Sequence, residues 1–421
     1  MESDHSQPPP PPLGIPWKVC RATSLLFLGR QWGAVCTALI LAVLAHELPI
    51  SGFGRFTFYL AVFAFFDGFV DFGTGTVTLQ RGTSNEEHFL AALGAARRVR
   101  AVTASCAGLF LGTCVLHWAE GGAAWIALAG FYPLTRVFEA SALCFQRSIA
   151  HGVPVLVRSL SATLRLVSIC GLALGGVHSV PLLLLVHASW IAAANLVLHR
   201  LARRHLPRIG DSTIPLDTPR LATLTLLRTA FPLALAGMFQ QAYFYVDNLF
   251  VRSLLGLEEL GLYNAAARIF SWLVLVAAYA TSAALPWLVR RHEAGGLRAA
   301  TARLGLCLSG IGVLAVAPLW LHDETILVSV FGNAYAGSAT SLRWLLGAAI
   351  CVFAGSGFLT AIIAAGKNWT AAMIALAALI VNVIGNLLWI PHMGIEGAAA
   401  ATFASECTVC ITSILILQRH V

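Results

Sequence analysis

The sequence predicts an all-α polytopic membrane protein with about twelve transmembrane helices in two six-helix lobes. Of its 421 residues 58% are hydrophobic and only 11% are charged, and the mean hydropathy is +0.79. Soluble domains, by contrast, carry about a quarter charged residues. The apolar residues form successive runs, each long enough for a helix to cross a hydrocarbon core of about 30 Å. The basic residues gather in short clusters between these runs, as they do in the loops of polytopic proteins.

Apolar runs bounded by charged or turn residues give the expected crossings. The twelve runs are residues 22–45, 54–79, 101–118, 122–145, 152–174, 179–199, 229–252, 261–288, 302–321, 339–365, 369–390 and 396–417.

The domain organisation follows from the polar segments between these runs. Residues 1–21, which include five consecutive prolines, are predicted to be a disordered cytoplasmic tail. Residues 22–200 are predicted to form an N-terminal six-helix lobe and residues 228–421 a C-terminal one. The longest polar connection, residues 201–227, is predicted to be a cytoplasmic linker.

The distribution of lysine and arginine orients the chain. Nineteen basic residues lie in segments expected on one side of the membrane, and only Arg55 and Arg252 lie on the other. Because cytoplasmic loops carry the excess of basic residues, we expect both termini and the linker in the cytoplasm.

Composition and loop length also exclude classes of function. The formal charge of +8 is spread over short loop clusters, so we expect no nucleic-acid partner. No connection is long enough to build an acid/base site outside the membrane, and the histidines are isolated, which argues against an enzyme. Cys407 and Cys410 have the CxxC spacing inside a predicted helix without a second pair, so we expect small-residue packing there and neither a disulfide nor a metal.

The two halves carry a faint repeat. The segment that enters the second crossing contains Gly54 and Phe56, and the segment that enters the eighth contains Gly261 and Tyr263, both at an offset of 207 residues. Two halves of like topology predict a pseudo-twofold axis along the membrane normal and a cavity between the halves.

Several motifs occur together in an order and spacing typical of one family. They are Asp71-Phe72-Gly73, Phe231-Pro232, Tyr245-Val-Asp247, Leu260-Gly261-Leu-Tyr263-Asn-Ala-Ala-Ala-Arg268, Ala284-Leu-Pro286, Phe331-Gly-Asn-Ala-Tyr335, Asn382 to Asn386 and Pro391-His-Met-Gly394-Ile-Glu-Gly397.

With these motifs the chain resembles the bacterial polysaccharide and O-antigen flippases of the multidrug/oligosaccharidyl-lipid/polysaccharide (MOP) exporter superfamily. The resemblance implies a two-lobed, MATE-like fold in the bacterial inner membrane. It also implies transport of an undecaprenyl-pyrophosphate-linked oligosaccharide for surface polysaccharide such as O-antigen lipopolysaccharide, with the polysaccharide polymerase machinery as a further partner.

Arginines inside predicted crossings are the candidate headgroup ligands. A charge at the bilayer centre costs about 2.5–3.5 kcal/mol on insertion scales, so such residues usually face a partner or a wet cavity. Guanidinium groups offer paired donors to phosphate oxygens. We predict that Arg30, Arg158, Arg165 and Arg268 bind the pyrophosphate, with a structural role as the alternative, above all for Arg268, which lies closer to the outer boundary.

Intramembrane carboxylates are candidates for ion coupling. We predict that Asp67 and Asp71, one helical turn apart, bind the coupling ion, H⁺ or Na⁺; the alternative is that each pairs with an arginine. Asp247 and Glu406 are expected to make interhelical hydrogen bonds or ion pairs, and Arg136 and Glu139 to neutralise each other at i, i+3 spacing. No cofactor is expected.

Two other functions fit the same fold. One is export of multidrug cations, for which carboxylates and aromatic residues would be expected in the cavity. The other is transport of a peptidoglycan lipid precursor. A polytopic glycan ligase or acyltransferase would instead require a large outer loop with a reactive side chain, and the sequence has no such loop.

Overall fold

The computed structural model describes residues 17–81, 86–117, 123–147, 152–205 and 218–420, and these contain helices and short turns but no strand. The first half comprises α1 (Trp17–Glu47), α2 (Ile50–Asp71), α3 (Thr74–Arg81), α4 (Glu86–His117), α5 (Ala123–Thr135), η1 (Val137–Ser141), α6 (Ala142–Arg147), α7 (Gly152–Leu174) and α8 (Val180–His205). The second half comprises α9 (Thr218–Leu255), α10 (Leu257–Glu293), α11 (Leu297–Leu321), α12 (Asp323–Phe331), η3 (Asn333–Ser338), α13 (Ala339–Ala364), α14 (Asn368–Met393) and α15 (Ile395–His420).

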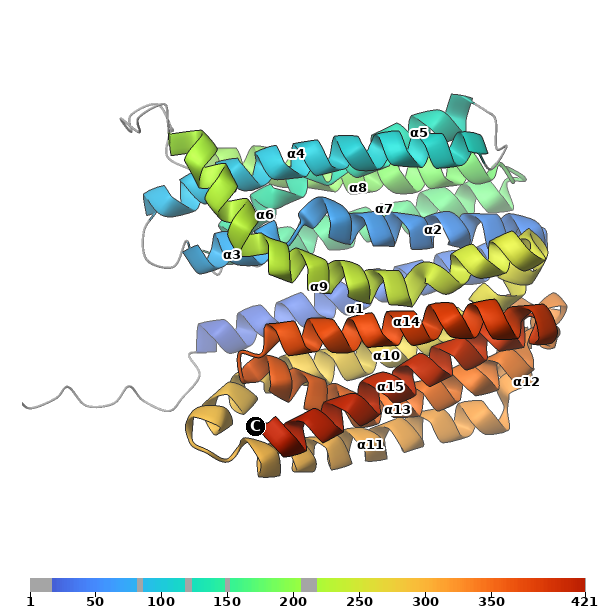
Figure 1. Ribbon diagram of the computed structural model, residues 1–421. Coiled ribbons are helices and arrows are strands. Elements are labelled where there is room, and N and C mark those ends of the chain that lie inside the picture. Colours follow the sequence, from blue (N-terminus) through green and yellow to red (C-terminus); the bar gives the residue numbers. More distant parts are fainter. Residues whose placement is uncertain (1–16, 82–85, 118–122, 148–151, 206–217, 421) are drawn as a thin grey trace, which may run out of the picture.

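The two halves form separate groups of helices. Helix α1 packs on α7 and α4 on α5, whereas α13 packs on α10, α11 and α15, and α14 packs on α9 and α15. Figure 1 shows the first group above the second, with α9 running from α4 at its start to α14 farther along. The start of α1 and the end of α15 lie at the same end of the bundle, as an even number of crossings requires.

Ten helices in the described part of the chain are long and apolar enough to cross a membrane. The all-α polytopic prediction is therefore confirmed, although the number twelve is not. The two further expected crossings are residues 122–145, which are divided among α5, η1 and α6, and residues 229–252, which lie within α9. The latter carries Gln240, Gln241, Asp247 and Asn248, an unusually polar set for a crossing.

Helix ends differ from the predicted segment boundaries in two places. Helix α1 begins at Trp17, inside the predicted tail, whose residues 1–16 lie outside the described residues. Helix α8 continues to His205 and α9 begins at Thr218, so both helices extend into the predicted linker, of which residues 206–217 are not described.

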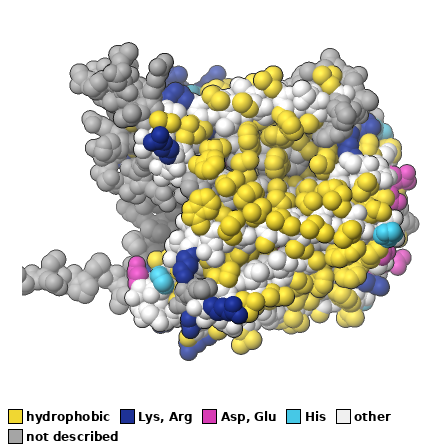
Figure 2. Space-filling view, in the orientation of Figure 1, with side chains coloured by type: hydrophobic (Ala, Val, Ile, Leu, Met, Phe, Trp, Pro, Cys, Tyr) yellow, Lys and Arg dark blue, Asp and Glu magenta, His cyan; other side chains and the backbone are white. Residues whose placement is uncertain are grey.

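The outer surface is apolar where lipid would contact it. Leu109, Leu306, Leu314 and Leu321 are each 75% exposed or more. Figure 2 shows hydrophobic side chains over the middle of one face and charged side chains toward its two ends. In a bilayer, a helix bundle with such an apolar belt exposes to lipid the hydrophobic side chains that a soluble protein would bury.

The two lobes meet closely where α2 and α10 begin. A Cβ atom added to Gly54 would lie 2.1 Å from the carbonyl oxygen of Leu257, and one added to Gly261 would lie 2.4 Å from that of Ile50. One turn farther along, Asn264 Nδ2 donates to Thr57 Oγ1 at 3.0 Å, again across an offset of 207 residues. These four residues, Gly54, Thr57, Gly261 and Asn264, form the outer seam, at the end of the bundle that the distribution of basic residues predicts to face outward.

Candidate functional site

A cavity of about 480 Å³ lies between the two halves. Its wall is built from α1 and α2 of the first half and from α9, α10 and α15 of the second. The polar and charged side chains among its lining residues are Thr37, Gln241, Tyr243, Tyr245, Asp247, Asn248, Tyr263, Asn264, Arg268, Ser271, Tyr279, Thr402 and Glu406.

Arg268 is the arginine that lines this cavity. It is partly buried, and its Nε atom is inaccessible to solvent without a hydrogen-bond partner. Among the described residues no carboxylate forms an ion pair with Arg268, although such pairs hold several other arginines. A guanidinium left unpaired beside a cavity is available to an anionic ligand.

The other three predicted arginines are not part of the cavity wall. Arg30 is exposed on α1, one turn before Gly33, which does line the cavity. Arg158 on α7 donates to Glu139 Oε1 at 3.1 Å. Arg165, also on α7, lies near Cys36 and Tyr132 inside the N-terminal lobe, and its Nε has no hydrogen-bond partner.

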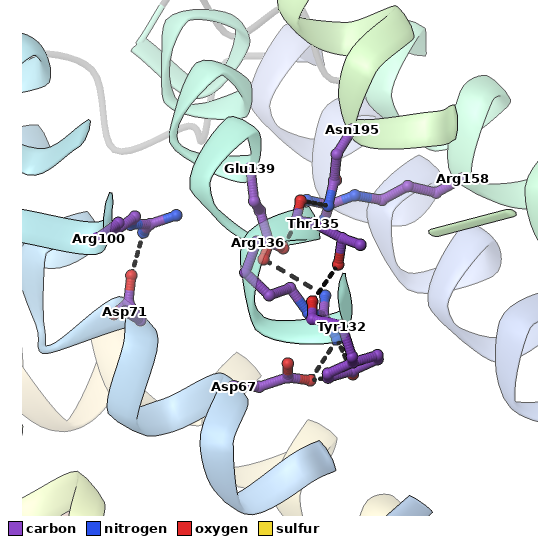
Figure 3. Close-up of polar contacts among 9 residues, drawn as sticks. All are labelled: Asp67, Asp71, Arg100, Tyr132, Thr135, Arg136, Glu139, Arg158 and Asn195. Atoms are coloured by element: carbon purple, nitrogen blue, oxygen red, sulfur yellow. Dashed lines mark hydrogen bonds and ion pairs between the residues drawn. The ribbon is translucent and has the colours of Figure 1, made fainter. Parts of the chain in front are cut away.

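The first half contains a network of partly buried charges around a break in its helices (Figure 3). Pro133 interrupts the helical hydrogen bonding, and the chain continues as the 3₁₀ helix η1, with Arg136 N–H bonded to the Pro133 carbonyl at 3.1 Å. This geometry directs Arg136 toward Asp67 on α2 in an ion pair, and Tyr132 OH donates to the same Asp67 oxygen at 3.1 Å.

The network extends from Arg136 to α7. Arg136 Nη1 also contacts Glu139 Oε2 at 3.4 Å, as its i, i+3 spacing suggested, and Glu139 in turn accepts from Arg158. Two arginines, Arg136 and Arg158, therefore share the carboxylates of Asp67 and Glu139. These four charges neutralise one another, whereas Arg165 forms no ion pair among the described residues.

Asp71 has a separate partner at the end of α2. Phe72 adopts the left-handed conformation with φ 48°, which ends α2 and allows α3 to leave in a new direction. Asp71 forms an ion pair with Arg100 of α4, and Arg100 Nε donates to Thr74 Oγ1 at 3.1 Å. For both Asp67 and Asp71, the structure shows the pairing with an arginine that was the alternative to ion coupling.

Two carboxylates of the second half have only neutral hydrogen-bond partners among the described residues. Asp247 accepts from Tyr263 OH at 2.8 Å, from Thr402 Oγ1 at 2.6 Å and from Asn386 Nδ2 at 2.8 Å. Glu406 accepts from Tyr243 OH at 2.7 Å. The expected interhelical hydrogen bonds are present, but sequence reasoning missed the cluster that they form; the polar Asn382 to Asn386 motif inside an apolar helix was the available signal.

The N-terminal network is expected to stabilise its lobe. Changing Arg136 to Met should lower the free energy of unfolding by roughly 3 kcal/mol, the low end of the range for breaking a buried ion pair. We expect the low end because the Asp67 side chain is 30% exposed and therefore remains partly solvated. Changing Asp67 to Leu in addition should restore most of the loss, since no charge is then left unpaired. Thermal melting in detergent measures both effects.

The matched control for this experiment is Arg298→Met. Arg298 is exposed in the first turn of α11 and forms no ion pair among the described residues, so its loss should change stability by less than about 0.5 kcal/mol. Equal melting temperatures for Arg136→Met and the unmodified protein would show that the network contributes nothing to stability.

Two helical lobes in a membrane with a polar cavity between them are the architecture of a transporter. The family model described as "Polysaccharide biosynthesis protein" matches residues 19–292, and the chain belongs to this family. No curated protein matches the chain in sequence.

Solved structures share the fold. The lipid II flippase MurJ in an inward closed conformation is 14% identical, with a TM-score of 0.70 over 95% of this chain and 87% of that one. An inward-facing multidrug resistance transporter of the MATE family is 13% identical, with a TM-score of 0.68 over 92% and 94%. A MOP superfamily transporter from Pyrococcus furiosus is 14% identical, with a TM-score of 0.65 over 95% and 94%. The predicted polysaccharide biosynthesis family and the predicted MATE-like fold are both confirmed.

Proposed function

We propose that this protein is a flippase that moves an undecaprenyl-pyrophosphate-linked oligosaccharide across the bacterial inner membrane for surface polysaccharide synthesis. Membership of the polysaccharide biosynthesis family supports the pathway, and the fold shared with MATE transporters and MurJ supports transport. The protein acts without chemical catalysis, its termini lie in the cytoplasm, and the polysaccharide polymerase machinery receives its product.

The observation that carries the proposal is the unpaired Arg268 on the cavity wall. A pyrophosphate cannot enter hydrocarbon without replacement of its lost hydration, and a fixed guanidinium provides charge and directed donors. Arg30 can assist, because it continues the stripe of Gly33, Ala34 and Thr37 by which α1 lines the cavity. Arg268 and Arg30 belong to different lobes, so a headgroup held by both would bridge them.

The remaining candidate residues would have to rearrange before they could bind a ligand. Arg158 is held by Glu139, so it can contact phosphate only after this ion pair opens. Arg165 keeps an unpartnered Nε inside the lobe and would need to reorient to reach the cavity. For ion coupling, Asp67 and Asp71 would likewise have to release Arg136 and Arg100 before they bound an ion.

One observation favours a second candidate, the export of a multidrug cation. Asp247 and Glu406 line the cavity together with aromatic side chains that include Tyr243, Tyr245 and Trp272. Carboxylates and aromatic faces attract organic cations. Both carboxylates are, however, already hydrogen-bonded within the second lobe, whereas Arg268 is not.

Deletion of the gene in its own host tests the function. We expect loss of surface polysaccharide, accumulation of the lipid-linked oligosaccharide in the inner leaflet, and restoration of both by the unmodified gene on a plasmid. Drug susceptibility of the same strains provides the comparison. Normal surface glycan together with increased sensitivity to organic cations would contradict the flippase proposal and support the second candidate.

A further inference from the structure

Arg165 faces the interior of the N-terminal lobe rather than lipid. On α7 it lies three, four and eight positions from Ala162, Ile169 and Ala173, which are at most 4% exposed. Residues at these spacings share one face of a helix. The Arg165 side chain, itself partly buried, therefore leaves α7 on the face that packs inside the lobe. Because arginine stays protonated in proteins, it brings a positive charge into the lobe.

Helix α8 places His187 at the same level. Ser161 Oγ donates to the Trp190 carbonyl at 2.8 Å, and Trp190 Nε1 donates to Ser168 Oγ at 3.1 Å. Trp190 therefore lies beside the segment of α7 that contains Arg165. His187, one turn from Trp190 on α8, lies near Arg165 and is 8% exposed. Its ring forms no hydrogen bond with any other residue that the structure describes.

Two further buried side chains adjoin Arg165. Cys36 on α1 is fully buried, and Tyr132 on α5 is 2% exposed. The hydroxyl proton of Tyr132 is already directed to Asp67, so Tyr132 has no donor left for a ligand. The Cys36 thiol is a weak donor beside the guanidinium. The surroundings of Arg165 therefore offer donors to an anion from α7, α8 and α1.

The charge of Arg165 is not balanced within the lobe. Among the described residues, each acid inside the crossings of this lobe is held by another arginine: Asp67 by Arg136, Glu139 by Arg136 and Arg158, and Asp71 by Arg100. Arg165 forms neither an ion pair nor a hydrogen bond with any described residue, and its Nε is inaccessible to solvent. A buried charge or polar group without a partner is costly, and one anion beside Arg165 and His187 would satisfy both.

We propose that Arg165 and His187, with Cys36 beside them, bind one halide ion, chloride in the cell, inside the N-terminal lobe. Guanidinium and imidazole groups supply the N–H donors that an anion accepts. The single uncompensated positive charge balances a monovalent anion. A pyrophosphate would instead bring surplus negative charge into the lobe.

This site is separate from the cavity between the lobes. Arg268 belongs to the wall of that cavity, whereas Arg165 and His187 do not. The halide would join α1, α7 and α8 of one lobe. It would also neutralise an arginine that otherwise competes with Arg268 for the headgroup. This last effect rests on the proposed function, but halide binding itself does not.

Thermal melting of the purified full-length protein in detergent tests the site. Equal concentrations of NaCl, NaBr and sodium gluconate keep both the ionic strength and the Na⁺ concentration constant. We expect chloride and bromide to raise the melting temperature in a saturable manner, because a ligand that binds only the folded state stabilises it. Gluconate should not, since a sugar-acid anion requires far more room than a halide. Radioactive ³⁶Cl⁻ should bind with a stoichiometry of one ion per chain, and bromide should displace it.

Variants assign the binding to these residues. Arg165→Gln should remove both the chloride response and ³⁶Cl⁻ binding. In gluconate this variant should melt no lower than the unmodified protein, because the uncompensated charge is gone. Arg303→Gln, the same change at an exposed residue of α11, should retain the whole response.

His187→Phe provides a second variant that keeps a ring of similar size. It should raise the half-saturating chloride concentration about tenfold, as loss of one hydrogen bond to a charged group predicts. If Arg165→Gln fails to fold, His187→Phe and Arg165→Lys replace it. Arg165→Lys keeps the charge and should still bind chloride, but more weakly than arginine does.

Four results would overturn the inference. They are an equal response to chloride and gluconate, a chloride response of unchanged affinity in both His187→Phe and Arg165→Gln or Arg165→Lys, loss of ³⁶Cl⁻ binding in Arg268→Ala but not in Arg165→Gln, and displacement of ³⁶Cl⁻ by inorganic pyrophosphate at equal concentration. The last result would assign Arg165 to the headgroup. Glycan export is not measured here, so failure of the flippase proposal and failure of the halide site remain distinguishable.

Discussion

Replacing Arg268 by alanine is expected to abolish surface glycan in a complementation assay while protein remains at normal levels in the membrane. A charge-assisted hydrogen bond contributes about 1.5–3 kcal/mol, so loss of the guanidinium should weaken headgroup binding by roughly 10- to 150-fold. Lysine at this position should restore export only in part, because it keeps the positive charge but not the paired donors.

The control is Arg298→Ala, a change of the same kind at an exposed residue in the first turn of α11. Arg30→Ala is expected to reduce export less than Arg268→Ala does. Arg30 lies on the face of α1 that lines the cavity, but it is not itself part of the cavity wall. Normal export by Arg268→Ala at wild-type protein levels would remove Arg268 from the headgroup site. Export lost instead on Arg158→Ala or Arg165→Ala would place this site inside the N-terminal lobe.

Substitution at the outer seam is expected to shift the protein toward a state that is open at this end. The Cβ of Gly54→Ala would lie 2.1 Å from the Leu257 carbonyl oxygen and 2.8 Å from the Gly261 nitrogen. Both are backbone atoms, which cannot turn aside as a flexible side chain can. The added atom must therefore separate α2 from α10 or strain the helices.

Overpacking of this kind costs about 1–3 kcal/mol, which corresponds to a shift of roughly 5- to 150-fold between two conformations. Gly261→Ala should act in the same direction, because its Cβ would meet the Ile50 carbonyl oxygen at 2.4 Å. Transport requires alternation between states, so we expect slow glycan export from either variant.

Labelling with a membrane-impermeant maleimide measures the opening directly. A cysteine introduced at Thr57, which is fully buried at the seam, should react slowly in intact cells and faster when Gly54→Ala is added. The same strains without the introduced cysteine give the background from the native thiols. Gly112→Ala is the matched control, because no atom lies within 4 Å of its added Cβ. Unchanged labelling and unchanged export in Gly54→Ala would show that the seam does not gate transport.

Sequence reasoning succeeded where the signal is local. Hydropathy and run length identify helices that cross a membrane, because each crossing must satisfy its backbone hydrogen bonds within itself. The offset of 207 residues was also informative, since it joins Gly54 to Gly261 and Thr57 to Asn264 in space. Helix ends were predicted less well, since α8 continues to His205 and α9 begins at Thr218, both within the segment predicted to be a linker.

The candidate site was predicted only in part. The sequence placed Arg268 within a crossing, but its closeness to the outer boundary made it the weakest of the four arginines, whereas in the structure it is the one on the cavity wall. Arg158 was the stronger headgroup candidate because it lies deeper in its predicted crossing, yet in the structure it forms an ion pair with Glu139. Depth in the membrane can be read from position along a helix, but the direction of a side chain depends on how that helix is rotated against its neighbours.

The sequence by itself determined that this chain is a helical membrane protein of the polysaccharide biosynthesis family with charged residues inside its predicted crossings. Only the tertiary structure decided which charges are neutralised, because the partners lie far apart in sequence: Asp67 and Arg136 are 69 residues apart, and Asp247 and Thr402 are 155 apart. Contacts over such separations depend on the packing of whole helices. The packing gave Asp67 an arginine and gave Asp247 only neutral donors, although both residues are aspartates inside a crossing.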